Sequence, residues 1–222
     1  MTSSPGEGVI RFDLRHDPRP LDERAFAETA RSLAAWREIL AHLRLLGRDP
    51  ARYAGLGYGN VSARVGPFGD VGRGRRRFLV TGTQTAGCAH ATLREFCLVE
   101  AWDVAANSVT SSGLVQPSSE SLTHAALYDA SPATRVVLHA HAPDLWRQAR
   151  ALGIPVTDAA AVNGTPAMAF EVARLYREGT LASTRIAAMG GHEDGVIALG
   201  ATAEEAGGVL VRHVARALAL KW

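Results

Sequence analysis

The most informative stretch of the chain is Val136-Val137-Leu138-His139-Ala140-His141-Ala142-Pro143, an apolar and partly β-branched run with two histidines near its end. Such a run is typical of a buried strand, and Pro143 ends it because proline cannot continue a central strand. Side chains two positions apart on a strand point to the same face. We therefore expect His139 and His141 to project into one space at the end of a strand.

Two histidines on one face of a buried strand favour a metal site. A lone buried histidine is usually a hydrogen-bonded core residue, but a pair would need several polar partners at once. Neutral imidazole is a common protein ligand for zinc and its first-row neighbours, and a strand leaves the other coordination positions open. We expect one divalent ion here, with zinc favoured over manganese, cobalt or iron.

A catalytic metal of this kind needs a third protein ligand, and His192 is the favoured candidate. It lies in the glycine-rich turn 190–195 between two expected strands, where a side chain can point inward. His124 is the competing candidate, because Glu120 precedes it by four residues and forms an E-x-x-x-H pair with it. The other histidines have no such partners nearby in sequence and are expected to be solvated: His16, His42, His90 and His213.

Length and composition set the broad class. The 222 residues carry 24 basic and 22 acidic side chains, a net charge of +2, so composition requires neither a nucleic-acid partner nor a disordered chain. We expect an N-terminal tail over 1–20 and a single domain over 21–222. No secretory leader or membrane span is evident, and the two cysteines are expected to be reduced, which predicts a cytoplasmic protein without a membrane partner.

Helical and strand patterns mix along the chain, which predicts α/β or α+β layering. The glycines of 55–59 lie between a helix and a strand, the wrong order for a dinucleotide-binding fingerprint. The basic run 72–77 has no interleaved aromatic residues and is expected at a solvated hairpin tip. Helices are expected at 22–46, 120–128, 144–152, 166–178 and 202–220, with strands near 60–65, 78–81, 96–102, 136–141, 186–189 and 196–199.

Several short motifs together resemble the class II aldolase/adducin family. In chain order they are Gly59-Asn60-Val61-Ser62, Thr81-Gly82-Thr83, Pro117-Ser118-Ser119-Glu120 with His124, the His-x-His strand and the late His192. The likeness spans about Glu28 to Leu218. It implies a class II aldolase/adducin-like domain over 21–222 with three αβα layers around a central, largely antiparallel sheet. It also implies a homotetramer with active sites at subunit contacts.

The resemblance also implies roles for individual residues. By matching position, His139, His141 and His192 hold the metal and Glu120 moves protons. The residues that match the family's phosphate or substrate pocket are Asn60, Thr81, Gly82, Thr83, Ser118 and Ser119. A divalent ion held by neutral imidazoles can stabilise an enediolate as a Lewis acid, and a nearby carboxyl can exchange its proton.

Three departures from the family pattern bear on the substrate. Gln84 follows Thr83 where the family has a glycine, and its side chain is expected to crowd a phosphate. Three positions separate His192 from Gly195 where the family motif is His-Gly, so the loop must bulge, and Asp194 is an alternative aligned position. No tyrosine follows Tyr176, whereas aldolases and epimerases of the family use one from a longer C-terminal tail.

The function that we expect is a metal-dependent carbon–carbon lyase of carbohydrate metabolism. It would cleave a small hydroxylated or sugar-like substrate, phosphorylated or not, by a retro-aldol reaction through a metal-stabilised enediolate. Decarboxylation and dehydration are alternatives on the same site. A metal-free scaffold domain, as in the adducin branch, is the alternative from another class, and it predicts lost ligands, whereas the three histidines and Glu120 are all present.

Overall fold

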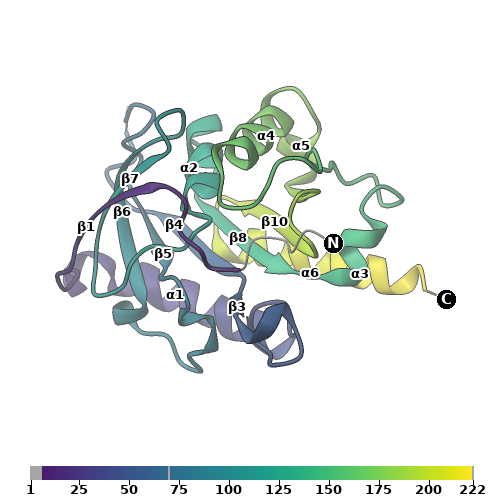
Figure 1. The fold of residues 1–222 in the computed structure, drawn as a ribbon, viewed down its shortest axis with the longest axis horizontal. Helices are drawn as coiled ribbons and strands as arrows, with labels where there is room; N and C mark the ends of the chain where they lie inside the picture. Colours follow the sequence, from purple (N-terminus) through teal and green to yellow (C-terminus); the bar gives the residue numbers. More distant parts are fainter. Residues whose placement is uncertain (1–6, 70, 222) are drawn as a thin grey trace.

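The computed structural model describes residues 7–69 and 71–221. Among these, eight strands form one sheet in the order β1-β7-β6-β5-β4-β8-β10-β9, in which only the edge pair β1–β7 is parallel (Figure 1). The predicted largely antiparallel sheet is therefore confirmed. Its strands are β1 (Asp13–Asp17), β4 (Asn60–Arg64), β5 (Phe78–Thr81), β6 (Phe96–Asp103), β7 (Ser108–Ser112), β8 (Val136–His141), β9 (Ile186–Ala188) and β10 (Gly195–Gly200).

Helices cover both faces of the sheet and complete the predicted three layers (Figure 1). One core contains buried residues of α1 (Glu23–His42), α3 (Pro143–Gln148) and α6 (Ala203–Ala219). The other contains those of α2 (Ser121–Ala130), α4 (Pro166–Arg177) and α5 (Leu181–Thr184). Successive side chains along a strand point to opposite faces of the sheet, so the buried side chains of each inner strand are shared between the two cores. The short strands β2 (Gly47–Arg48) and β3 (Gly57–Tyr58) pair separately.

Helix ends follow the local signals in the sequence. The Asp22 carboxylate accepts a hydrogen bond from Arg24 N at 2.9 Å, so it caps α1 as expected. Thr202 caps α6 by accepting from Glu205 N at 3.2 Å, and α4 starts with Pro166 at its first turn. No helix of the described residues is long and apolar enough to cross a membrane.

Two segments differ from what the sequence suggested. Asp13–Asp17, inside the predicted N-terminal tail, forms the edge strand β1, and Phe12 just before it is buried in the core. Strand β7, which ends with Ser111 and Ser112, was also not among the predicted strands. Both strands are poor in apolar residues: β1 is the edge strand and β7 is its neighbour, and with so few apolar residues their pattern is weak. The basic loop is also more ordered than expected, because Arg76 and Arg77 donate to the backbone carbonyls of Tyr128 and Gly66.

Strand β8 lies between β4 and β10 and fixes what surrounds its two histidines. In the ladders, His139 pairs with Asn60 on one side and with Ile197 on the other. His141, the last residue of β8, pairs with Gly195. The start of β4, the end of β8 and the loop between β9 and β10 therefore lie together where these neighbouring strands end.

Candidate metal centre

Three buried histidines converge at this end of strand β8. His139 and His141 come from β8, and His192 comes from the loop between β9 and β10. Their candidate ligand nitrogens all lie within 4.8 Å of one another, and each residue is at most 4% exposed. Of the two candidates for the third position, the structure thus brings His192, fifty residues away in sequence, to the His-x-His pair.

The two strand histidines have ring nitrogens available for a metal. His139 Nδ1 lies 3.1 Å from the Val196 carbonyl oxygen, which can only accept, so Nδ1 carries the hydrogen and Nε2 is left with a free lone pair. Among the described residues, His139 Nε2 and both nitrogens of His141 have no hydrogen-bond partner. A ligand histidine is normally held in this way, by a bond from its other nitrogen to a carbonyl or carboxylate. The donor set therefore fits a divalent ion.

A tight turn presents His192. Its backbone N donates to Met189 O at 3.0 Å, and Gly195 N donates to His192 O at 2.9 Å. Asp194 adopts a left-handed φ of 62°, which completes the expected bulge between His192 and Gly195. A Cβ on Gly195 would lie 3.0 Å from His192 Cγ, so glycine leaves room for the imidazole. The Asp194 carboxylate accepts from Tyr53 OH at 2.8 Å and lies outside the histidine cluster.

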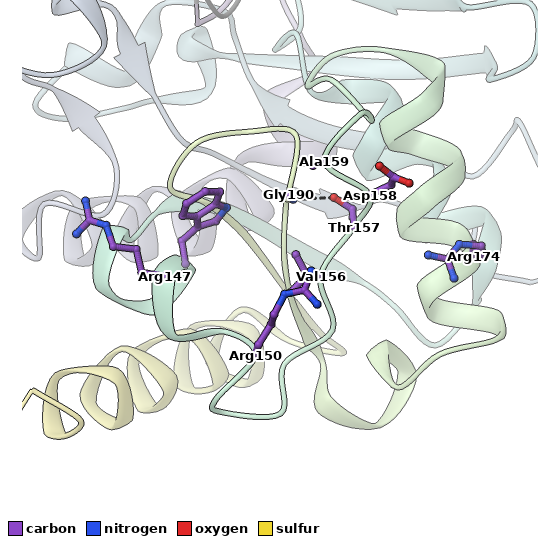
Figure 2. Close-up of a pocket in the computed structure, with 9 residues that line it drawn as sticks. Arg147, Arg150, Val156, Thr157, Asp158, Ala159, Arg174 and Gly190 are labelled. Atoms are coloured by element: carbon purple, nitrogen blue, oxygen red, sulfur yellow. Dashed lines mark hydrogen bonds between the residues drawn. The ribbon is translucent and has the colours of Figure 1, made fainter.

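The base of this turn is anchored from the outer side. Thr157 Oγ1 accepts from Gly190 N at 2.8 Å, and Trp146 Nε1 donates to Met189 O at 2.9 Å. Figure 2 shows the Gly190–Thr157 bond beside a pocket of about 620 Å³, which contains none of the predicted site residues. Its arginines come from different elements, and Figure 2 shows that they do not converge on one point. The pocket is therefore lined by the residues that anchor the His192 loop, and it is separate from the histidine cluster.

His124 is a core residue in this structure. Its Nδ1 lies 2.7 Å from Ser62 Oγ, which in turn lies 2.6 Å from Tyr128 OH. Burial lowers the pKa of His124 to about 3, so its imidazole is neutral. The E-x-x-x-H spacing brings it near Glu120, but it is not part of the histidine cluster found among the described residues.

Glu120 lies at the start of α2 with its carboxyl beside the cluster. Glu120 Oε1 is 3.8 Å from His192 Nδ1, and Glu120 Oε2 accepts from Thr123 Oγ1 at 3.0 Å. Burial raises the pKa of Glu120, and the nearby His192 opposes this shift only in part. A raised pKa makes it easier for the carboxyl to hold a proton and then transfer it, as a general acid or base must.

Burial also sets the charge of the three histidines. It lowers the pKa values of His139 and His141 well below the ordinary value, and the charge of His192 lowers them further. Burial acts on His192 in the same direction, but the hydrogen bond that its ring donates to Glu7 and the charge of Glu120 outweigh it and raise its pKa. The strand pair is therefore neutral, the form in which imidazole binds metals.

The six residues expected to form the substrate pocket lie on neighbouring segments. Asn60 pairs with His139 in the ladder, and its Oδ1 has no partner within the described part of the chain. A bridge between Gly82 and Pro117 joins the 81–83 turn to the Ser118-Ser119 turn. Three of the six side chains already have structural bonds: Thr81 Oγ1 accepts from Val61 N, Thr83 Oγ1 donates to Gly8 O, and Ser118 Oγ accepts from Glu120 N.

Gln84 lies in a turn whose backbone conformation suits a glycine, and its side chain packs beside the turn. Gln84 has a left-handed φ of 59°, a conformation that favours glycine. Its Oε1 accepts from Gly57 N at 3.4 Å, and its side chain packs against Gly8. The extra side chain is therefore placed against the turn beside the predicted phosphate site.

Sequence reasoning missed three residues near the histidines. The Tyr53 ring packs edge-on against His141 with centroids 4.5 Å apart, and Arg52 donates to the hydroxyls of Tyr53 and Tyr58. Glu7 Oε1 lies 2.6 Å from His192 Nε2 and 3.6 Å from His141 Nε2. Tyr53 starts a 3-10 helix of only three residues and Glu7 lies in a turn, so no periodicity or motif could have indicated them. An acidic residue in a presumed tail carries no signal of its own.

Comparisons with known proteins agree with this fold. L-fuculose-1-phosphate aldolase from Thermus thermophilus is 21% identical and matches with a TM-score of 0.61 over 87% of this chain and 93% of its own. YgbL from Escherichia coli, a candidate aldolase/epimerase/decarboxylase, is 15% identical with a TM-score of 0.62 over 87% and 88% of the two chains. No curated protein sequence matches.

A third similar structure is the N-terminal class II aldolase domain of a conserved protein from Thermoplasma acidophilum. It is 18% identical, with a TM-score of 0.61 over 93% of this chain and 99% of its own. At such identities structural likeness establishes the fold alone. The sequence model of the Class II Aldolase and Adducin N-terminal domain, however, matches residues 37–217, so the chain belongs to the class II aldolase/adducin family.

Proposed function

We propose that this protein is a divalent-metal-dependent lyase that cleaves a carbon–carbon bond in a small hydroxylated or sugar-like substrate by a retro-aldol reaction. The observation that carries the proposal is the convergence of three buried imidazoles, with free ring nitrogens, next to a buried carboxyl. A fold that needed these residues only for stability would leave such groups hydrogen-bonded. Membership of the family supports the same reading.

His139, His141 and His192 would hold the ion, with zinc favoured over manganese, cobalt or iron because zinc suits a set of imidazole ligands. When bound, the ion supplies a Lewis acid that stabilises negative charge on a substrate oxygen. The protein contributes the other steps. Glu120 would take up or release the proton, since its carboxyl is buried at the cluster and its pKa is raised.

Neutral donors would bind the rest of the substrate. Asn60 Nδ2, the hydroxyl groups of Thr83 and Ser119, and nearby backbone N–H groups are suited to a carboxylate or phosphate tail. Gln84 supports an unphosphorylated substrate, because its side chain lies against the turn where the family has glycine. The Thermus aldolase acts on a sugar phosphate, as its name states, so phosphorylated and free compounds must both be tested. We also propose a homotetramer, which light scattering of the purified protein would test.

The test combines a metal assay with a substrate panel. The parent protein should bind about one equivalent of divalent metal, and His139→Ala should lose it. His213→Ala is the matched control, since His213 Nδ1 bonds only to the carbonyl of Val209 in its own helix. Unchanged stoichiometric metal in His139→Ala would contradict the proposal.

The panel should include hydroxylated acids and sugars with and without phosphate, followed by mass spectrometry. Retro-aldol cleavage gives two carbonyl-containing or enolisable fragments, decarboxylation releases carbon dioxide, and dehydration removes one water. Decarboxylation is retained as an alternative because YgbL is described in those terms. A protein without bound metal and without any of the three activities would instead favour the scaffold function.

A further inference from the structure

We propose that Glu7 is a fourth protein ligand of the metal site, supplied by the N-terminal segment, and that a substrate must displace it. This inference rests on the metal site of the proposed function. It adds a residue that lies outside the 37–217 region matched by the family model. It also gives the segment before β1 a function that its sequence does not indicate.

The position of the Glu7 carboxylate carries the proposal. Its Oε1 lies 2.6 Å from His192 Nε2 and 3.6 Å from His141 Nε2, so one oxygen faces both imidazole nitrogens. The Glu7 side chain is only 14% exposed. A metal ion held by these imidazoles would have this oxygen within reach, and carboxylate oxygen is an ordinary ligand for zinc.

Glu7 and Glu120 approach His192 from different directions. Glu7 lies at Nε2 and also near His141 Nε2, whereas Glu120 lies 3.8 Å from His192 Nδ1. The two carboxyls are therefore not equivalent around the ring. Glu7 is placed to bind the ion, and Glu120 remains free to exchange a proton.

The chain holds Glu7 in this position through the residues that follow it. Thr83 Oγ1 donates to Gly8 O at 2.9 Å, and Gly8 has a φ of 72° that suits glycine. Four residues later, Phe12 is buried in the core, and the Arg11 carbonyl accepts from Asn107 Nδ2 at 2.9 Å. The short tether between Phe12 and Glu7 limits where the carboxylate can go.

The same contacts place the segment across the proposed substrate site. Thr83 is one of the predicted substrate-binding residues, and its hydroxyl is already used by Gly8. A substrate that reaches both the metal and Thr83 would therefore have to displace Glu7 and Gly8 together. Glu7 and Gly8 precede strand β1 and are not part of the sheet, so their displacement need not disturb it.

The experiment measures metal binding and ligand field with and without the carboxylate. Glu7→Gln removes the charge and keeps the shape, and Glu23→Gln is the matched control at an exposed position on α1. Zinc affinity is measured by competition with a chelator, and the cobalt-substituted proteins are compared by visible absorption. Glycolate, a small hydroxy acid, serves as the probe for the displaceable position.

We expect Glu7→Gln to weaken zinc binding by about 10–100-fold, to change the cobalt spectrum and to bind glycolate about tenfold more tightly than the parent. Glu23→Gln should match the parent in all three. Equal zinc affinity and spectra in Glu7→Gln and parent would overturn the inference, as would a weaker affinity with an unchanged spectrum, which would mean that Glu7 only orients His192. Failure of the parent to bind any metal would instead refute the proposed function.

Discussion

The two faces of strand β8 are equally buried, but one packs apolar side chains and the other carries ring nitrogens without hydrogen-bond partners in the described part of the chain. Val136, Leu138 and Ala140 pack into the core with α1, α3 and α6. His139 and His141 point to the opposite face, where His139 Nε2 and both ring nitrogens of His141 lack hydrogen-bond partners among the described residues. Burying an unpaired polar group costs free energy, so the histidine face is one that folding alone would not favour. The comparison separates residues kept for stability from residues kept for chemistry.

Removing a histidine of the polar face should have the largest effect. His139→Leu should abolish stoichiometric metal binding and lower activity by at least about 10³-fold, because a Lewis acid contributes several kcal/mol to such a reaction. The unfolding free energy of the metal-free protein should stay within about 1 kcal/mol of the parent, because the lost bond from Nδ1 to Val196 O is offset by removal of the buried, unpaired Nε2. Metal analysis, turnover and urea unfolding measure the three quantities. A large loss of stability in the metal-free protein would contradict the distinction between the faces.

Glu120→Gln should lower kcat by about 10²–10⁴-fold while metal content is retained, because the carboxamide keeps the shape but cannot exchange a proton. Steady-state kinetics and metal analysis on the same preparation separate these effects. Loss of metal together with activity would mean that Glu120 holds the ion instead of moving the proton.

Truncating the apolar face should act on stability alone. Leu138 is fully buried, and Leu138→Ala should lower the unfolding free energy by about 2–5 kcal/mol through lost contacts and a cavity. Zinc affinity of the folded fraction should stay within a few-fold of the parent. Urea unfolding and chelator competition check this, and a specific loss of zinc binding without destabilisation would remove the contrast between the faces.

Tyr128→Phe tests a buried polar group that is already satisfied. It removes the hydroxyl that lies 2.6 Å from Ser62 Oγ and should cost about 0.5–1.5 kcal/mol, the usual net value of one hydrogen bond. Metal content should not change, because the Ser62–His124 contact is outside the histidine cluster. Equilibrium unfolding and metal analysis suffice, and release of metal would show that this network supports the site.

The smallest effect is expected for the ion pair between Glu171 and Arg174 on α4, which belongs to neither face of β8. Hydrogen bonds from Arg174 and from Asp158 N hold the pKa of Glu171 down at about 2. A lowered folded-state pKa stabilises the protein above the ordinary glutamate pKa, and this stabilisation is lost as pH falls toward 2. Glu171→Gln should therefore be slightly less stable than the parent at pH 7, by an amount that salt reduces, and the difference should shrink in acid. Thermal unfolding at both pH values measures it, and a difference that grows in acid would be the wrong sign.

Much of the fold could be predicted from local patterns. The apolar runs predicted β4, β5, β6, β8, β9 and β10, and the predicted starts of α1 and α6 coincide with the caps at Asp22 and Thr202. The edge strand β1 and its neighbour β7 could not be predicted, because their few apolar residues give no clear period and their pairing joins residues about 95 positions apart. Local signals report local structure, and sheet edges depend on what else is nearby.

The sequence by itself determined that His139 and His141 share a face, because a strand has a period of two whatever surrounds it. Only the tertiary structure decided that His192 joins them while His124 bonds to Ser62, since the sequence left both open as the third ligand. It alone placed Glu7 against His192 across 185 residues. Side-chain direction within an element is fixed by backbone geometry, whereas contacts between distant segments arise only when the whole chain packs.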